Sequence, residues 1–262
     1  MTESSDGSEF GVIIPARYAS TRLPGKPLLD LGGKPMVVRV LEVAREAGAA
    51  FAMVATDDQR IVDVVTEAGG EAMITSDEHE SGTDRVAEVA RRLRLEPDLI
   101  VVNLQGDEPA LPSVLVTRVA QALRQEPEAS MATLASPLRE RRELFDANVV
   151  KVVVNQAGRA LYFSRAPMPW LRTEFAESEA RRSTAPLPED LFLRHIGLYA
   201  YRVSTLLSLS QTRPTPLEEA ESLEQLRALW LGMQIQVAIV PDLPSASVDT
   251  EADVERVRQL FE

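Results

Sequence analysis

Short apolar runs alternate with amphipathic segments four times within roughly the first 110 residues, and this rhythm constrains the fold more than any other feature. The apolar runs are typical of buried strands, and the segments between them have helical spacing. The expected strands are 10–15, 51–56, 71–75 and 98–105, and the helices between them are 35–49, 57–70 and 81–95. Such alternation predicts an α/β fold with a doubly wound, mostly parallel sheet. The run at 98–105 is apolar on both faces, so we expect a central, parallel strand.

The second half of the chain is less regular. Alternating and helical patterns predict a helix at 116–126, strands at 130–137, 149–155, 160–165 and 195–202, a long helix at 216–232, a strand at 233–240 and a helix at 250–262. The long helix opens at Pro216 and has an apolar stripe formed by Leu217, Ala220, Leu223, Leu226 and Trp230. A length of 262 residues fits one α/β domain with a sizeable insertion.

Composition excludes several classes of function. A net charge of −12 argues against a nucleic-acid partner, although it permits a small anionic ligand next to a local cationic cluster. The chain has no cysteine and only two histidines, so a bound metal would need oxygen ligands, which favours Mg²⁺. The N-terminal MTESSDGSEF lacks the features of a signal peptide, and no apolar run is long enough to span a membrane. We therefore expect a cytoplasmic protein.

The loop after the first strand reads PARYASTRLPGKPL and is rich in cations, proline and glycine. It could be an ordinary surface loop whose Gly and Pro residues set turns. A Walker A loop is excluded, because Pro27 follows Gly25-Lys26 and the earlier glycine is missing. The remaining alternative is a phosphate-binding loop, in which Arg17, Arg22 and Lys26 supply charge and Gly25 lets backbone amides approach.

Two aspartates are candidate metal ligands, and each has a simpler explanation. Asp107 follows the expected central strand in NLQGDEP, where it could hold a metal or serve only the turn. Asp249 in SVDTEADV could hold a metal, or Asp249 or Thr250 could cap the last helix. Ser81 similarly begins a capping box with Asp84 before the third helix, and exposed backbone groups there could also read a base.

Several motifs together resemble one family along nearly the whole chain. PARYASTRLPGKPL and GKPM look like the opening of the sugar nucleotidyltransferases. The match to the 3-deoxy-manno-octulosonate (Kdo) cytidylyltransferases continues through ATDD, HESGTDRVAEV, NLQGDEP, ALYFSRAPMPW, RHIGLYAYR, SLEQLRALW and VDT. The resemblance implies a nucleotide-diphospho-sugar transferase-like fold with an inserted sugar-binding and dimerisation subdomain. It also implies transfer of the cytidylyl group of CTP to Kdo, with release of pyrophosphate.

The resemblance implies specific site residues. Lys26, Asp107 and Asp249 would be catalytic, and the two aspartates would hold Mg²⁺. Nucleotide contacts would come from Ala16, Arg17, Ser20, Arg22, Lys26, Ser81, Gly82 and Thr83. Sugar contacts would come from Gln105, Arg165, His195, Tyr199, Glu224 and Gln225. Arg165 suits a carboxylate through its fork, Gln105 and Gln225 suit hydroxyls, and Glu224 could instead face solvent.

The same resemblance divides the expected single domain, 1–262, into functional halves. Residues from about 10 to 136 would bind the nucleotide, and residues from about 137 to 250 would bind the sugar and form a homodimer contact within 150–200. The chain departs from the family at Ser245-Ala246-Ser247, where glycines are usual, which affects the geometry of Asp249 or the choice of sugar. The alternatives are the same chemistry on a Kdo analogue or another 2-keto sugar acid, and a non-catalytic nucleotide-sugar binding protein. His79 is either a surface residue or a site residue.

Overall fold

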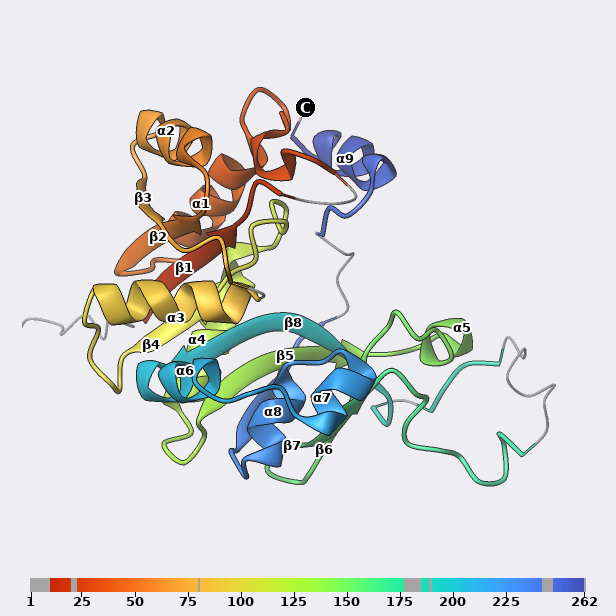
Figure 1. Cartoon of the computed structure of the whole chain (residues 1–262). Coiled ribbons are helices and arrows are strands. Elements are labelled where there is room, and N and C mark those ends of the chain that lie inside the picture. The colour runs from red at the N-terminus through yellow and green to blue at the C-terminus, as the bar shows by residue number, and fades with distance from the viewer. Residues whose placement is uncertain are drawn as a thin grey trace, which may run out of the picture. The chain divides into compact units, whose positions relative to one another are not determined.

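The computed structural model describes residues 10–19, 23–79, 81–176, 185–188, 190–241 and 247–261. The chain forms two compact units (Figure 1). Unit 1 comprises Met1–Arg124, Leu198–Gln211 and Ser245–Glu262, and unit 2 comprises Gln125–Gly197 and Thr212–Pro244. Compactness does not show which ligand each part binds, so the functional halves at about 10–136 and about 137–250 stay a prediction.

Unit 1 contains the predicted parallel sheet, with strand order β3-β2-β1-β4. These strands are β1 (Phe10–Ala16), β2 (Phe51–Thr56), β3 (Glu71–Ile74) and β4 (Ile100–Asn103). Strand β4 is fully buried, as its apolar sequence indicated. The expectation that it lies between parallel neighbours was only half right. It pairs parallel with β1, whereas residues 199–202 of β8 (Leu193–Arg202) pair with it antiparallel.

Several helices of unit 1 begin at a residue whose side chain caps them. Asp58 accepts a hydrogen bond from the Arg60 amide, and Ser81 accepts one from the Asp84 amide, so each side chain satisfies a backbone donor of the first turn. Pro35 stands at the N-cap of the first helix rather than inside it. The helices are α1 (Met36–Glu46), α2 (Gln59–Glu67), α3 (Gly82–Arg92), α4 (Ser113–Arg124), α6 (Val203–Ser210) and α9 (Glu251–Arg258). The sequence analysis did not foresee α6.

The last helix and the loop after β1 share one hydrophobic cluster. Leu23, Leu31 and Met36 pack with Val248, Val254 and Val257. The guanidinium of Arg39 lies over the ring of Phe261, 4.3 Å from its centroid. Figure 1 shows α9 beside this loop. Residues more than 200 positions apart are therefore held together by burial of apolar surface.

Unit 2 contains a parallel pair and an antiparallel hairpin. Strands β5 (Met131–Pro137) and β9 (Ile235–Ile239) are parallel, and β6 (Lys151–Val154) and β7 (Ala160–Ser164) form the predicted hairpin. Residues 193–194 of β8 pair antiparallel with β6. A second hydrophobic cluster consists of Leu138, Leu144, Phe175, Leu187 and Phe192. The short helix α5 (Arg141–Leu144) was not foreseen.

The prediction of one long helix at 216–232 was wrong. The structure has α7 (Pro216–Glu221) and α8 (Gln225–Trp230), separated at Ser222, which adopts a left-handed conformation with φ 51°. The predicted apolar stripe is accordingly broken. Leu223 and Leu226 are buried, whereas 38% of Leu217 and 57% of Trp230 are exposed. Local spacing could not reveal this break, because its cause lies in contacts with other elements.

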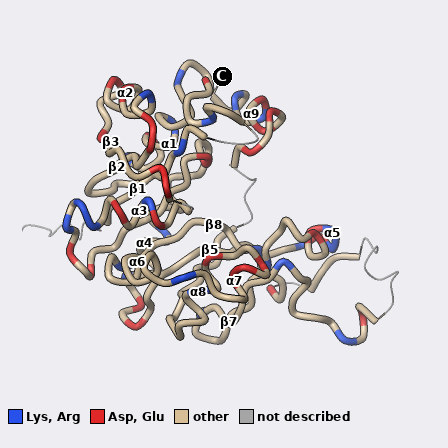
Figure 2. Tube along the Cα trace, in the orientation of Figure 1, with Lys and Arg blue, Asp and Glu red and all other residues tan. Residues whose placement is uncertain are grey.

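Charges are interleaved along both units. Figure 2 shows Lys and Arg scattered among Asp and Glu on each of them. No helix among the described residues is long and apolar enough to cross a bilayer.

Candidate functional site

The loop after β1 brings its cations to the carboxyl end of the sheet. Ala16 is the last residue of β1, and Arg17 follows it with an exposed side chain. Gly25 has φ 70°, which suits glycine, and its amide donates to the Tyr18 carbonyl at 3.2 Å. This turn starts a 3₁₀ helix, η1 (Lys26–Leu28), so the position of Lys26 is set by the backbone. The predicted contacts Ser20 and Arg22 lie outside the described residues.

Lys26 lies between the two candidate metal ligands. Its Nζ is 2.8 Å from Oδ2 of Asp107 and 3.3 Å from Oδ1 of Asp249. Only 12% of the Lys26 side chain is exposed, against 35% for Asp107 and 42% for Asp249. All three residues belong to unit 1. The structure therefore brings together the two aspartates that the sequence singled out, and it places a cation between them.

The backbone also tethers the two aspartates. The Val248 amide donates to the Asp107 carbonyl at 2.9 Å, which connects the neighbouring residue Asp249 to the loop after β4. That loop approaches β1 closely, because the Gly106 amide donates to the Pro15 carbonyl at 3.2 Å. A Cβ at Gly106 would lie 2.7 Å from this carbonyl oxygen, so the close approach requires glycine.

Each aspartate had a simpler local explanation, a turn for Asp107 and a helix cap for Asp249. The structure shows how far each explanation applies. The Glu108 amide donates to the Gln105 carbonyl, so Asp107 does belong to a turn, while its side chain faces Lys26. Thr250 caps α9 and forms a capping box with Asp253. Because Thr250 is the cap, the Asp249 carboxylate is available to pair with Lys26.

Glu108 is a further acidic residue at this site that the sequence analysis did not select. Burial, together with the negative charges of Asp107 and Asp249, raises the pKa of its carboxyl group to about 8. At neutral pH Glu108 is then mainly uncharged. Its place directly after Asp107 in the GDEP motif was the available signal.

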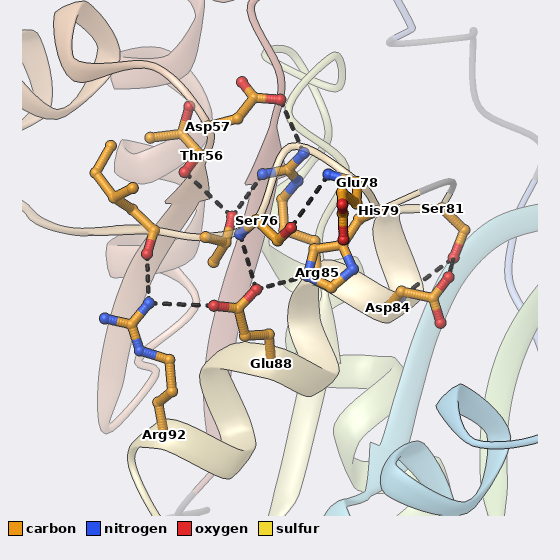
Figure 3. Close-up of polar contacts among 12 residues, drawn as sticks. Thr56, Asp57, Ser76, Glu78, His79, Ser81, Asp84, Arg85, Glu88 and Arg92 are labelled. Atoms are coloured by element: carbon orange, nitrogen blue, oxygen red, sulfur yellow. Dashed lines mark hydrogen bonds and ion pairs between the residues drawn. The ribbon is translucent and has the colours of Figure 1, made fainter.

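A buried ion pair connects the start of α3 to the first loop. Arg85 of α3 donates through Nη2 to Oδ2 of Asp57 at 2.9 Å, and only 4% of the arginine side chain is exposed. The other carboxylate oxygen of Asp57 accepts from the Tyr18 amide at 3.2 Å. Arg85 also donates to the Thr75 hydroxyl, which in turn donates to the Thr56 carbonyl. Figure 3 shows Arg85 reaching from α3 to Asp57 beyond the end of β2.

This network lies next to the predicted nucleotide contacts. Tyr18 directly follows Arg17, and Arg85 lies within one turn of Ser81, Gly82 and Thr83. A neighbouring set of contacts around Glu88 holds the loop before α3, because its carboxylate accepts from the Ser76 amide and pairs with His79 at 2.6 Å (Figure 3). His79 thus has a structural partner. The sequence analysis missed Asp57 and Arg85, although both stand in motifs that it used.

We expect Asp57→Asn to weaken the binding of CTP, the nucleotide that the resemblance implies, about tenfold. An amide can still accept from Tyr18, but it loses the charge that neutralises buried Arg85, so the first loop and the start of α3 are no longer held together. Isothermal titration calorimetry with CTP would measure the change. Asp63→Asn is a matched control, because Asp63 is exposed on α2 and bonds only to Gln59 among the described residues. Equal CTP affinity in both variants would contradict the expectation.

The predicted sugar contacts are divided between the two units, and Gln105 and Tyr199 belong to unit 1. The Gln105 amide donates to the Asn103 side chain at 3.0 Å. A Cβ on Gly82 would lie 3.2 Å from Oε1 of Gln105, so this amide packs against the start of α3. Tyr199 is half-buried on β8, with its ring centroid 5.9 Å from that of Tyr201.

Arg165, in unit 2, is already engaged by the protein backbone. Its Nε donates to the Glu221 carbonyl at 2.7 Å, Nη1 to the Ala147 carbonyl at 3.0 Å, and Nη2 to the Ser222 carbonyl at 3.5 Å. These contacts use three of the five guanidinium N–H groups, so two remain for a ligand. The buried ammonium of Lys151 donates to the Arg165 carbonyl at 2.6 Å, which fixes the backbone of Arg165 as well.

Glu221 is a contact to Arg165 that the sequence analysis did not assign. Its carboxylate accepts from the Ser164 hydroxyl at 2.6 Å and from the Arg165 amide at 3.0 Å. The end of β7 is therefore joined to the end of α7, which explains why the chain turns at Ser222 rather than continuing as a helix. The only available signal was that Glu221 lies about one helical turn before the candidate sugar contacts Glu224 and Gln225.

The other three candidates in unit 2 differ in exposure. The His195 ring contacts the Thr133 hydroxyl at 3.0 Å and meets Phe163 edge-on, and burial lowers the pKa of His195 to about 3, so it is neutral at pH 7. Gln225 is buried, and its amide nitrogen has no partner among the described residues, as a ligand-binding group would. Glu224 is exposed, which was the alternative left open for it.

Among the described residues, no group of three or more His, Cys, Asp or Glu side chains could hold a metal ion by itself. Asp107 and Asp249 nevertheless share one cationic partner, so a single position close to both carboxylates exists. Two protein ligands are fewer than the roughly six oxygens that Mg²⁺ prefers. An ion at this position would need further oxygen ligands from a substrate or water.

Comparisons with known proteins agree with this arrangement. Residues 11–235 match a family model described as Cytidylyltransferase, which defines the class of the protein. A relative from Hahella chejuensis, named 3-deoxy-manno-octulosonate cytidylyltransferase, is 53% identical and aligns over 97% of this chain and 98% of its own length. A relative of the same name from Methylococcus capsulatus is 52% identical over 96% of each chain. The chain belongs to the 3-deoxy-manno-octulosonate cytidylyltransferase family.

Two solved structures are similar to the chain, at different levels. The structure of CMP:2-keto-3-deoxy-manno-octonic acid synthetase complexed with CTP is 43% identical, covers 97% of this chain and 98% of its own, and has a TM-score of 0.85. A cytidylyltransferase from Leptospira borgpetersenii is 17% identical with a TM-score of 0.56, so it shares the fold. It covers 95% of this chain, and 85% of its own length is matched.

Proposed function

We propose that this protein transfers the cytidylyl group of CTP to Kdo, forming CMP-Kdo for lipopolysaccharide synthesis. The anomeric oxygen of the sugar bonds to the α-phosphorus of CTP, the bond from that phosphorus to pyrophosphate breaks, and the hydroxyl proton is lost. The observation that carries the proposal is the convergence of Lys26, Asp107 and Asp249 at the carboxyl end of the parallel sheet. The names of the full-length relatives give the substrate class.

The nucleotide contacts are proposed on unit 1. Arg17, Arg22 and Lys26 would neutralise the triphosphate, because forked and point-like cations bind phosphate oxygens strongly. Backbone and side-chain groups of Ala16, Ser20, Ser81, Gly82 and Thr83 would complete the contacts. The capping role of Ser81 is compatible with this, because the first amides of a helix point outward toward a ligand.

Mg²⁺ is the proposed cofactor, and Asp107 and Asp249 are its proposed ligands. Their oxygens are the hard donors that this ion prefers, and they already face a common cation. When bound, Mg²⁺ would neutralise phosphate charge and lower the pKa of the attacking hydroxyl group. Lys26 would then stabilise the negative charge that develops on the phosphates as the bond to pyrophosphate breaks.

The sugar contacts are proposed as Gln105, Arg165, His195, Tyr199, Glu224 and Gln225. The two remaining N–H groups of Arg165 suit the carboxylate of an acidic sugar, and its many backbone contacts would hold the guanidinium ready for binding. The buried amide nitrogen of Gln225 suits a hydroxyl oxygen. Neutral His195 could accept or donate a hydrogen bond without bringing a charge.

We also propose that the protein is a cytoplasmic homodimer. Exposed apolar side chains occur at Leu161, Trp170 and Leu191, within the region 150–200 where self-association is expected. The proposal assigns nucleotide binding to residues from about 10 to 136 and sugar binding to residues from about 137 to 250.

A substrate panel tests the proposed function. Pyrophosphate release would be measured with CTP and Mg²⁺ against Kdo, an amino-substituted Kdo analogue and another 2-keto sugar acid. We expect release that requires both CTP and the sugar, with the highest kcat/KM for Kdo. Preference for an analogue would change the substrate assignment. Tight CTP binding without turnover of any sugar acid would instead indicate a binding protein.

A further inference from the structure

Lys26 has two incompatible sets of partners if the proposed function is right. In the structure its ammonium is 2.8 Å from Asp107 and 3.3 Å from Asp249. A triphosphate would require the same ammonium, and a divalent cation would require the same carboxylates. The ammonium and a divalent cation cannot both lie between the two carboxylates, because two positive charges repel each other strongly at such distances. The ion and the ammonium must therefore exclude each other.

We propose that Lys26 exchanges partners during binding: it occupies the carboxylate pair of the nucleotide-free protein and keeps a divalent cation out until a nucleoside triphosphate draws the ammonium away. The inference rests on the proposed function in its choice of triphosphate and metal. It goes beyond that function by fixing the order of binding, since the cation binds to the aspartates only with or after the nucleotide.

Burial makes Lys26 an effective competitor for the cation. Its side chain is 12% exposed, so solvent screens its charge less than it screens the aspartates, which are 35% and 42% exposed. The aspartates are also too few to compensate for the repulsion. No group of three or more potential ligands occurs among the described residues, so a metal without a nucleotide would have two carboxylates at most here.

The exchange requires movement of the Lys26 side chain but not of the backbone. Gly25 and η1 fix the main chain at Lys26, and the surrounding loop shares a hydrophobic cluster with Val248 and α9. The distance between the Lys26 and Asp249 backbones is therefore set by packing. Four methylene groups let the ammonium turn from the carboxylates toward phosphate oxygens.

Mn²⁺ binding, measured by electron paramagnetic resonance and calorimetry, tests the inference without any turnover. In the absence of nucleotide we expect Lys26→Met to bind Mn²⁺ about tenfold or more tightly than the wild type, because a cation next to the site has been removed. The same substitution should weaken CTP binding by about tenfold or more, since a charge-assisted contact to phosphate is lost. A purely structural role for Lys26 would not produce changes of opposite sign.

Four further variants make the test specific. Lys26→Arg retains the charge, so its nucleotide-free Mn²⁺ affinity should stay near that of the wild type. Lys34→Met is the matched control, because Lys34 lies in the same segment and pairs with Glu42. In a Lys26→Met/Asp107→Asn double variant, the gain in Mn²⁺ affinity should disappear. Lys26→Gln, which retains a polar group at this position, replaces Lys26→Met if the latter does not fold.

Two results would overturn the inference. One is nucleotide-free Mn²⁺ affinity in Lys26→Met or Lys26→Gln that does not exceed the wild-type value. The other is a gain that persists when Asp107 is replaced. Failure of the proposed function would look different, because the wild type would then not bind CTP while the nucleotide-free Mn²⁺ comparison would remain valid.

Discussion

Replacing Asp107 or Asp249 by Asn should lower kcat/KM for pyrophosphate release by about a thousandfold. Each amide keeps the size of the side chain and loses the charge that attracts a divalent cation. Such an ion contributes several kcal/mol to stabilising charge in the transition state, and ~1.4 kcal/mol corresponds to a tenfold change in rate. Because both carboxylates face the same cation, they should act as one unit.

The double variant Asp107→Asn/Asp249→Asn should therefore be little slower than either single variant, since groups that act together are not additive. Asp98→Asn is the control, because Asp98 is exposed in the turn before β4 and lies outside the site residues. Thermal unfolding would confirm that each variant is folded. A single variant that retains more than about a tenth of wild-type activity would contradict the role given to that aspartate.

Arg227→Met should destabilise the protein by about 3–5 kcal/mol. Arg227 of α8 donates through Nε to Oε2 of Glu218 at 2.8 Å and through Nη2 to its other carboxylate oxygen. The two side chains are 11% and 8% exposed. Removing the guanidinium leaves a buried carboxylate without its counter-charge, and it also frees the Thr212 carbonyl, which accepts from Nη1 at 3.0 Å.

Urea unfolding would measure the loss, and two further variants would locate its cause. Glu218→Gln/Arg227→Met should recover much of the stability, because Gln carries no charge and can still accept from the Thr215 amide in the capping box. Arg142→Met removes an exposed ion pair with Glu140 and should cost less than about 1 kcal/mol. If Arg227→Met costs no more than Arg142→Met, the buried pair does not stabilise the junction of α7 and α8.

The parts of the site that depend on neighbouring residues were predictable. Ser81 was expected to cap one helix, and Asp249 or Thr250 to cap the last one. In the structure Ser81 and Thr250 are the caps, and each accepts a hydrogen bond from an amide three residues later. The loops after β1 and β4 were expected to carry the site because parallel strands place ligands beyond their carboxyl ends. Both expectations concern contacts within a few residues or the direction of adjacent strands, which a pattern of residue types reveals.

The buried contacts of the second half were not predictable in this way. The spacing of 216–232 favours a continuous helix, but the Glu221 carboxylate bonds to Ser164 and Arg165, and Glu218 pairs with Arg227. These contacts stabilise a left-handed Ser222 between two short helices. Arg165 was expected to bind a ligand with its guanidinium, and the sequence did not reveal that three of its five N–H donors also bind backbone carbonyls. In each case a partner far along the chain outweighs local preference.

Residue types alone thus establish an α/β chain with a cation-rich loop, two candidate metal ligands and the family to which it belongs, because alternation, caps and motifs are local properties. The meeting of Lys26 with Asp107 and Asp249 is a property of the folded chain. These residues are separated by 81 and 223 positions, and a shared hydrophobic cluster together with the Val248–Asp107 backbone hydrogen bond holds their segments together. Residues so far apart that bury apolar surface against each other leave no periodic pattern in the sequence. Only the packing of the folded chain therefore determines which charged side chains become neighbours.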